Sequence, residues 1–124
     1  MKKTATKTKK ETKVIDAAGR PLGRVASEAA TYLIGKNTPA YERNVFSGCP
    51  VRVVNASQIE ITEKKLGDLQ HLRYSGHPGG LRTDKGMHTA AKKGMKELVR
   101  LAVDRMLPKN KLRKEMVKHL TVEN

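Results

Sequence analysis

Residues 14–35 decide the fold, and their sequence is VIDAAGRPLGRVASEAATYLIG. The stretch opens on Val14-Ile15 and continues through Ala17, a short apolar run that predicts a buried β-strand. Ala18-Gly19 follows at once and predicts the turn that ends this strand. The stretch therefore begins as a strand followed by a tight connection.

A helix is predicted directly after the turn. Pro21 suits the first turn of a helix, because the N–H that proline lacks has no partner at that position. Gly35 supplies the C-terminal stop. Between them, apolar residues recur at spacings of three and four: Leu22, Val25, Ala26, Ala29 and Leu33. We predict an amphipathic helix over residues 22–34.

The middle of the chain favours a loop followed by strands. Asparagine, glycine and prolines interrupt residues 36–50. Residues 51–55 form a strong β run, and Ile59 and Ile61 alternate with polar residues in what we predict to be a second short strand. Residues 69–74 are predicted to form a third.

The last third is predicted to be helical up to Pro108, which ends the helix. Asn110 can cap a short successor. The expected apolar stripe of the first helix contains Ala91, Met95, Leu98, Ala102 and Met106, with Val99 and Val103 beside it, and that of the second contains Leu112, Met116 and Leu120. Strand, helix, strand and further helices indicate a small α/β sheet with parallel members.

Charge points to a polyanionic partner. The 124 residues, the length of one ordinary domain, carry a formal charge of +14, which repels itself unless nucleic acid or an anionic surface neutralises it. A membrane is the weaker alternative, because no apolar run approaches the roughly 20 residues that span a bilayer. We find no signal peptide and expect a cytoplasmic protein.

Residues 1–13 are predicted to be a basic tail, disordered in the free protein. They contain six lysines and four threonines and have no hydrophobic periodicity. This segment is either a solvated tail or a set of phosphate contacts for RNA. Residues 14–124 are predicted to form a single RNA-binding α/β domain.

No cofactor, metal site or small-molecule substrate is indicated. Cys49 is the only cysteine, so neither an internal disulfide nor a cysteine-based zinc site can form. The four histidines lack metal-ligand spacing, and the carboxylates show no paired-acid pattern. His77 as a catalytic base is the weaker alternative, since no nucleophile with a recognisable context accompanies it.

Three basic motifs favour RNA. The turn between Gly19 and Gly23 exposes Arg20 and Arg24 at a helix start, where phosphate binding and plain solvation are about equally good interpretations. The glycines around His77 allow the backbone to approach a sugar-phosphate chain closely. A dense basic cluster follows Pro108 and consists of Lys109, Lys111, Arg113, Lys114 and Lys118. With only three tyrosines, one phenylalanine and no tryptophan for base stacking, recognition of folded RNA is favoured.

Taken together, these motifs resemble the bacterial large-subunit ribosomal protein L13 family, universal name uL13. The resemblance runs collinearly from about residue 14 to residue 122. The matching stretches are residues 14–17 through 22–24, Gly35-Lys36, Val53-Val54-Asn55-Ala56, Tyr74-Ser75-Gly76-His77-Pro78-Gly79-Gly80 and residues 103–112. The chain departs from the family pattern at Arg105, where glycine usually precedes Met-Leu-Pro, and over residues 110–114.

The resemblance implies a three-layer α/β/α domain around a mostly parallel four-stranded sheet. It also implies a non-enzymatic constituent of the large ribosomal subunit that binds large-subunit rRNA beside neighbouring ribosomal proteins and takes part in early assembly. The residues carried over from the motifs are Arg24, Lys36, His77, Gly79, Gly80, Arg82, Lys109, Lys111 and Arg113. Arg20 and Lys114 join this predicted RNA-binding set from their own motifs.

Two other classes stay open at this point. One is an α/β enzyme acting on RNA or nucleotides with His77 in its site, motivated by the glycine-rich turn and the predicted sheet. The other is a DNA-compacting basic protein, although the chain shows no helix-turn-helix, ribbon arm or dimer seam.

Overall fold

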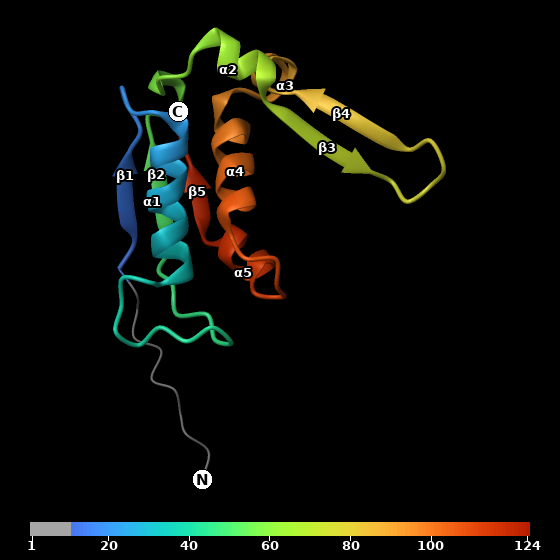
Figure 1. Ribbon diagram of the computed structural model, residues 1–124. Helices are drawn as coiled ribbons and strands as arrows, with labels where there is room; N and C mark the ends of the chain where they lie inside the picture. The colour runs from blue at the N-terminus through green and yellow to red at the C-terminus, as the bar shows by residue number, and fades with distance from the viewer. Residues whose placement is uncertain (1–10) are drawn as a thin grey trace.

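The computed structural model describes residues 11–124 (Figure 1). The elements in chain order are β1 (Lys13–Asp16), α1 (Leu22–Ile34), β2 (Val51–Val54), the single-turn 3-10 helix η1 (Ala56–Gln58), α2 (Glu63–Asp68), β3 (Gln70–Tyr74), β4 (Leu81–Lys85), α3 (Gly86–Lys93), α4 (Met95–Met106), α5 (Arg113–Lys118) and β5 (Leu120–Val122). Residues 1–10 of the predicted tail lie outside the described residues. Strand β1 begins one residue before the predicted Val14, because Lys13 already pairs with Val51.

The main sheet has three parallel strands in the order β1-β2-β5. Its inner face carries Ile15, Val51 and Val53, each at most 2% exposed. Strand residues alternate between faces, so Val14 and Arg52 fall on the opposite face, where both are exposed. The predicted mixed α/β fold with a parallel sheet is confirmed. In the described part of the chain helices cover one face of this sheet, so the predicted three-layer arrangement is not found.

Helix α1 matches its predicted bounds, and its predicted apolar stripe is buried. The helix ends at Gly35 in the left-handed conformation, at φ +84°, with the Gly35 N–H bonded to the Thr31 carbonyl. The loop that follows returns over this helix end, where the Cys49 N–H donates to the Tyr32 carbonyl at 3.2 Å. Gly48 permits this return, because a Cβ at that position would lie 1.8 Å from the Leu33 carbonyl oxygen.

Helix α4 lies beside α1 over the inner face of the sheet and completes the core with Val99 and Val103 (Figure 1). The predicted last helix is interrupted: Gly94, at φ +84°, separates α3 from α4. The predicted stripe therefore does not run continuously, and Ala91 at one end and Met106 at the other are exposed. Pro108 follows the end of α4 as predicted.

The predicted four-stranded sheet is not found, because the structure has a three-stranded parallel sheet and a separate two-stranded hairpin. Ile59 and Ile61 form no strand, because residues 56–58 turn as η1 and a single bridge joins Glu60 to Pro21. Leu120, predicted on the last helix, instead begins β5 and pairs with Val51. The predicted strand over residues 69–74 exists as β3, but it pairs only with β4 in a separate antiparallel hairpin.

The hairpin projects away from the main sheet (Figure 1). Two contacts fix its base. The Gly86 N–H donates to the Leu69 carbonyl at 2.7 Å, and Arg105 Nη2 donates to the Gln70 carbonyl at 2.7 Å. Because Arg105 lies on α4, the second bond joins the hairpin to a core helix. None of the described helices is long and apolar enough to span a membrane.

Candidate nucleic-acid interface

The predicted RNA-binding residues lie in three separate regions. Arg20 and Arg24 occupy the β1–α1 turn and the first turn of α1. A second group lies on the hairpin and contains His77, Gly79, Gly80 and Arg82. The third group lies near the C-terminal ends of α1 and α4 and contains Lys36, Lys109, Lys111, Arg113 and Lys114. The hairpin and the third group are at opposite ends of α4 (Figure 1). The structure thus does not bring the predicted residues into one site.

The two arginines of the β1–α1 turn differ in their partners. Arg20 Nη2 lies 2.7 Å from a carboxylate oxygen of Glu28 on α1, and this pair is only partly exposed. Arg24 is exposed and forms no ion pair within residues 11–124. Arg20 therefore orients the turn, while Arg24 presents a free cation.

The turn itself is held by a carboxylate. Asp16 Oδ1 accepts hydrogen bonds from the Ala18 N–H at 3.0 Å and from Asn55 Nδ2 at 2.9 Å. Both bonds lower the pKa of Asp16 because they stabilise its charged form, and the bond from the Ala18 N–H has the larger effect. Asn55 has φ +58° and lies where β2 ends, so the bond joins the C-terminal ends of two neighbouring strands.

A basic cleft lies between the hairpin and α3, with a volume of about 310 Å³; we call it the hairpin cleft. Arg73 and Arg82 line it and are direct cross-strand partners. Like charges facing each other across a strand pair destabilise it. Lys92 and Lys93 of α3 line the same cleft and add two further cations.

Acidic groups neutralise this cleft only in part. Asp84 lies 3.7 Å from Arg73, a long contact between largely exposed side chains. Glu97 lines the cleft but pairs with Arg100. Four cations against these two carboxylates leave a positive excess, which a phosphate backbone can neutralise.

His71 is the least satisfied polar side chain of the hairpin cleft. Both of its ring nitrogens are buried and have no hydrogen-bond partner among the described residues. Burial, followed by the charge of Arg105, lowers the pKa of His71, while the nearby carboxylates of Asp84 and Glu97 act in the opposite direction. The neutral imidazole is therefore favoured in the folded protein.

The hairpin tip exposes its backbone. Gly76 and Gly79 have φ of +89° and +74°, values that L side chains rarely adopt. A Cβ at either position would meet nothing within 4 Å, so these glycines shape the turn without being packed against other residues. His77 is exposed between them. This geometry suits close approach of the tip to another molecule.

In the third region, one of the predicted cations is already bound within the chain. Arg113 Nε donates to Asp104 Oδ1 at 2.9 Å, and its Nη2 donates to the other carboxylate oxygen. This bidentate pair fastens α5 to α4. Lys109, Lys111 and Lys114 are exposed and form no ion pair in the described chain.

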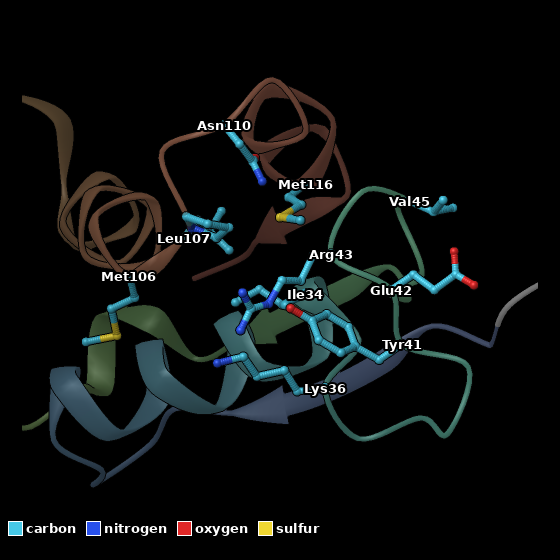
Figure 2. Close-up of a pocket in the computed structure, with 11 residues that line it drawn as sticks. Ile34, Lys36, Tyr41, Glu42, Arg43, Val45, Met106, Leu107, Asn110 and Met116 are labelled. Carbon is cyan, nitrogen blue, oxygen red and sulfur yellow. The ribbon is translucent and has the colours of Figure 1, made fainter.

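A second cavity, of about 430 Å³, opens in this third region between residues 36–50 and the α4–α5 connection. Lys36 lines it, together with Tyr41 and Arg43, which sequence reasoning did not single out (Figure 2). Sequence reasoning also missed Arg73. Strand periodicity places Arg73 on the same face of β3 as His71, because side chains two residues apart share a face, and this could have indicated a role. No local signal pairs Arg43 with Lys36.

Comparison with known proteins matches residues 10–122 to the family model described as ribosomal protein L13. The curated protein "Large ribosomal subunit protein uL13" of Aquifex aeolicus is 44% identical over 109 residues, which cover 88% of this chain and 75% of that protein. The protein of the same name from Persephonella marina is 43% identical over 114 residues, covering 92% and 75%. One from Clostridium botulinum is 45% identical over 112 residues, covering 88% and 75%.

Proposed function

The chain belongs to the ribosomal protein L13 family, and we propose that it is a non-enzymatic constituent of the large ribosomal subunit that binds large-subunit rRNA. The family match carries this proposal, and the dispersed cations support it. Free arginines and lysines occur in all three regions, and no group of three or more histidine, cysteine or acidic side chains in residues 11–124 could hold a metal ion.

The proposed mechanism is phosphate neutralisation at several separate points. The hairpin tip projects away from the main sheet, while Lys109, Lys111 and Lys114 follow the C-terminal end of α4 (Figure 1). A protein with cations so far apart can contact several RNA segments at once. Holding several RNA segments before the remaining contacts form is the basis for the proposed role in early subunit assembly. This role would be carried out in the cytoplasm, beside neighbouring ribosomal proteins.

The proposed rRNA contacts fall into two classes. The exposed cations Arg24, Lys36, Arg82, Lys109, Lys111 and Lys114 contact phosphates, and His77, Gly79 and Gly80 bring the hairpin tip close to RNA. Arg20 and Arg113 lie in the same regions, but each is bound to a carboxylate of its own chain. We place them at the edge of the interface, where they orient the turn and α5.

Sedimentation of a cell lysate tests the proposal directly. The lysate is run through a sucrose gradient after a moderately high-salt wash, and the chain is followed by mass spectrometry. Near-stoichiometric presence in the large-subunit peak is the expected result. Finding the chain only at the top of the gradient contradicts the ribosomal assignment and favours the alternative of a nucleotide-acting enzyme.

A variant of the third region tests the mechanism. Changing Lys109, Lys111 and Lys114 together to alanine removes three free cations and no internal ion pair. Each lost phosphate contact lowers the slope of log affinity against log salt by somewhat under one unit. Binding to large-subunit rRNA therefore weakens, and its salt dependence flattens. Unchanged affinity removes these lysines from the interface.

A further inference from the structure

The cavity of about 430 Å³ in the third region has walls from distant parts of the chain. One wall is the loop over residues 36–50, which contributes Tyr41 and Arg43, and the opposite wall contains Leu107, Asn110 and Met116. Figure 2 shows the two walls facing each other, with the end of α1 at the base. The volume is within the range of pockets that hold small molecules.

The loop wall is anchored at its far end. The Phe46 ring stacks on His119, with ring centroids 4.8 Å apart and planes 11° apart. Ser47 Oγ donates to the Ile34 carbonyl at 3.3 Å. At the near end, the Thr38 N–H donates to the Gly35 carbonyl at 3.1 Å. The segment with Tyr41 and Arg43 is therefore held between two fixed points, and the cavity is part of the fold.

Two cations point into the cavity. Figure 2 shows the ends of Lys36 and Arg43 turned toward the same space, next to the Tyr41 hydroxyl. Neither cation forms an ion pair within residues 11–124. Glu42 is the one carboxylate among the residues that line the cavity, and its side chain points away from both cations (Figure 2). The part of the cavity next to these two cations is therefore complementary to a phosphate.

The interior suits a flat, largely apolar group with polar edges. Leu107 and Met116, each 3% exposed, form one surface, and Tyr41 contributes an aromatic ring opposite them. Asn110 Oδ1 accepts from the Arg113 N–H at 3.2 Å, which leaves its Nδ2 free to donate. A nucleobase has this combination of stacking faces and carbonyl edges.

We propose that this cavity, which we call the nucleotide pocket, receives one nucleotide extruded from large-subunit rRNA. Its phosphate lies against Lys36 and Arg43, and its base lies between Tyr41 and the Leu107–Met116 surface, with Asn110 Nδ2 as a donor to the base edge. The inference rests on the proposed function, because it names the rRNA element that this region holds.

Ultraviolet cross-linking of the full chain on protein-free large-subunit rRNA tests the pocket. After irradiation, nuclease and trypsin digestion release the peptide over residues 37–43, which contains Tyr41. We expect this peptide to carry a mononucleotide adduct on Tyr41. An adduct found only on peptides of the hairpin or the β1–α1 turn contradicts the proposal.

A double variant, Lys36→Ala with Arg43→Ala, measures the contribution of the two cations. Two charge-assisted contacts to one phosphate are lost, so we expect affinity for the same rRNA to fall about tenfold. The matched control is Lys64→Ala with Lys65→Ala, which removes the same charge from exposed positions on α2. Equal losses in the two variants indicate general charge only and overturn the pocket.

The outcomes separate this inference from the proposed function. Wild-type binding to rRNA without an adduct on residues 37–43 overturns the pocket and leaves the proposed function standing. A wild type that does not bind large-subunit rRNA at all overturns both. In intact subunits, cross-links of these residues to another protein instead of RNA assign the cavity to a protein neighbour and also overturn the proposal.

Discussion

The sheet half of the molecule, formed by β1, α1, β2, α4, α5 and β5, buries most of its apolar side chains, whereas the hairpin half, formed by α2, β3, β4 and α3, exposes most of its own. None of the buried hydrophobic residues lies between residues 60 and 97. Leu72, Tyr74 and Leu81 of the hairpin are each more than 60% exposed. An isolated two-stranded hairpin is marginally stable in water. The comparison indicates that the sheet half provides most of the stability, while β3 and β4 add an exposed contact surface to those of the β1–α1 turn and the third region.

A matched pair of leucines gives the largest expected contrast. Leu33 of α1 is fully buried, so Leu33→Ala removes core packing and lowers the free energy of unfolding by about 2–5 kcal/mol. Leu72→Ala on the hairpin changes it by less than about 0.5 kcal/mol, because that side chain is 65% exposed. Urea unfolding measures both. Equal losses contradict the division into two halves.

Substitutions at two glycines, one in each half, test the same division through the backbone. Gly48→Ala places a methyl group against the Leu33 carbonyl and destabilises the fold by about 1–3 kcal/mol, the usual cost of overpacking. Gly67→Ala on α2, where a Cβ meets nothing within 4 Å, stabilises by up to about 1 kcal/mol through helix propensity. Thermal melts of the two variants measure the difference, and a tolerated Gly48→Ala is the contrary result.

Substitution of the paired arginines of the hairpin cleft should weaken RNA binding without lowering the stability of the fold. Arg73→Ala with Arg82→Ala removes a like-charge cross-strand pair, so stability stays unchanged or rises by less than about 1 kcal/mol. Affinity for large-subunit rRNA falls, since two phosphate contacts are lost. The control, Arg20→Ala with Arg52→Ala, removes the same charge from arginines held by Glu28 and Glu123. A larger affinity loss in the control contradicts the assignment of the hairpin cleft to RNA.

The smallest expected effect is a pH dependence from His71. Burial lowers the pKa of His71 in the folded protein below the ordinary value of 6.5. Between the folded and unfolded pKa values, the unfolded chain therefore binds more protons than the folded protein. The contribution of neutral His71 to stability is therefore complete above pH 6.5 and is lost as pH falls through the folded pKa. Melting temperature should fall less steeply below pH 6.5 in His71→Gln than in the wild type. Parallel slopes in the two proteins contradict this.

The sequence predicts local structure better than pairing. Helix α1 is predicted to its ends because its apolar stripe and Gly35 lie within one segment. Strand β5 is missed because only His119 separates Leu120 from α5 and no glycine or proline ends the helix, so only pairing with Val51 defines the strand. Residues 70–74 are recognisable as a strand, but the partner over residues 81–85 is set by the turn at Gly76 and Gly79.

In the candidate site, too, features with a local sequence signal are predicted and features that depend on tertiary packing are not. Motifs identify the exposed residues of the hairpin tip and of the basic cluster, because glycine and charge are visible locally. The internal ion pair of Arg113 with Asp104 could not be predicted, since it depends on how α5 packs on α4. Arg43 and Tyr41 join Lys36 only when the loop returns over the end of α1, a tertiary event with no local signature.

Hydrogen exchange of the full chain, free and bound to large-subunit rRNA, tests the division into two halves most directly. We expect fast exchange over residues 70–85 in the free protein, with marked protection there on binding and little change in α1 and β2. Protection of the hairpin equal to that of α1 in the free protein, or no change in the hairpin on binding, would contradict it.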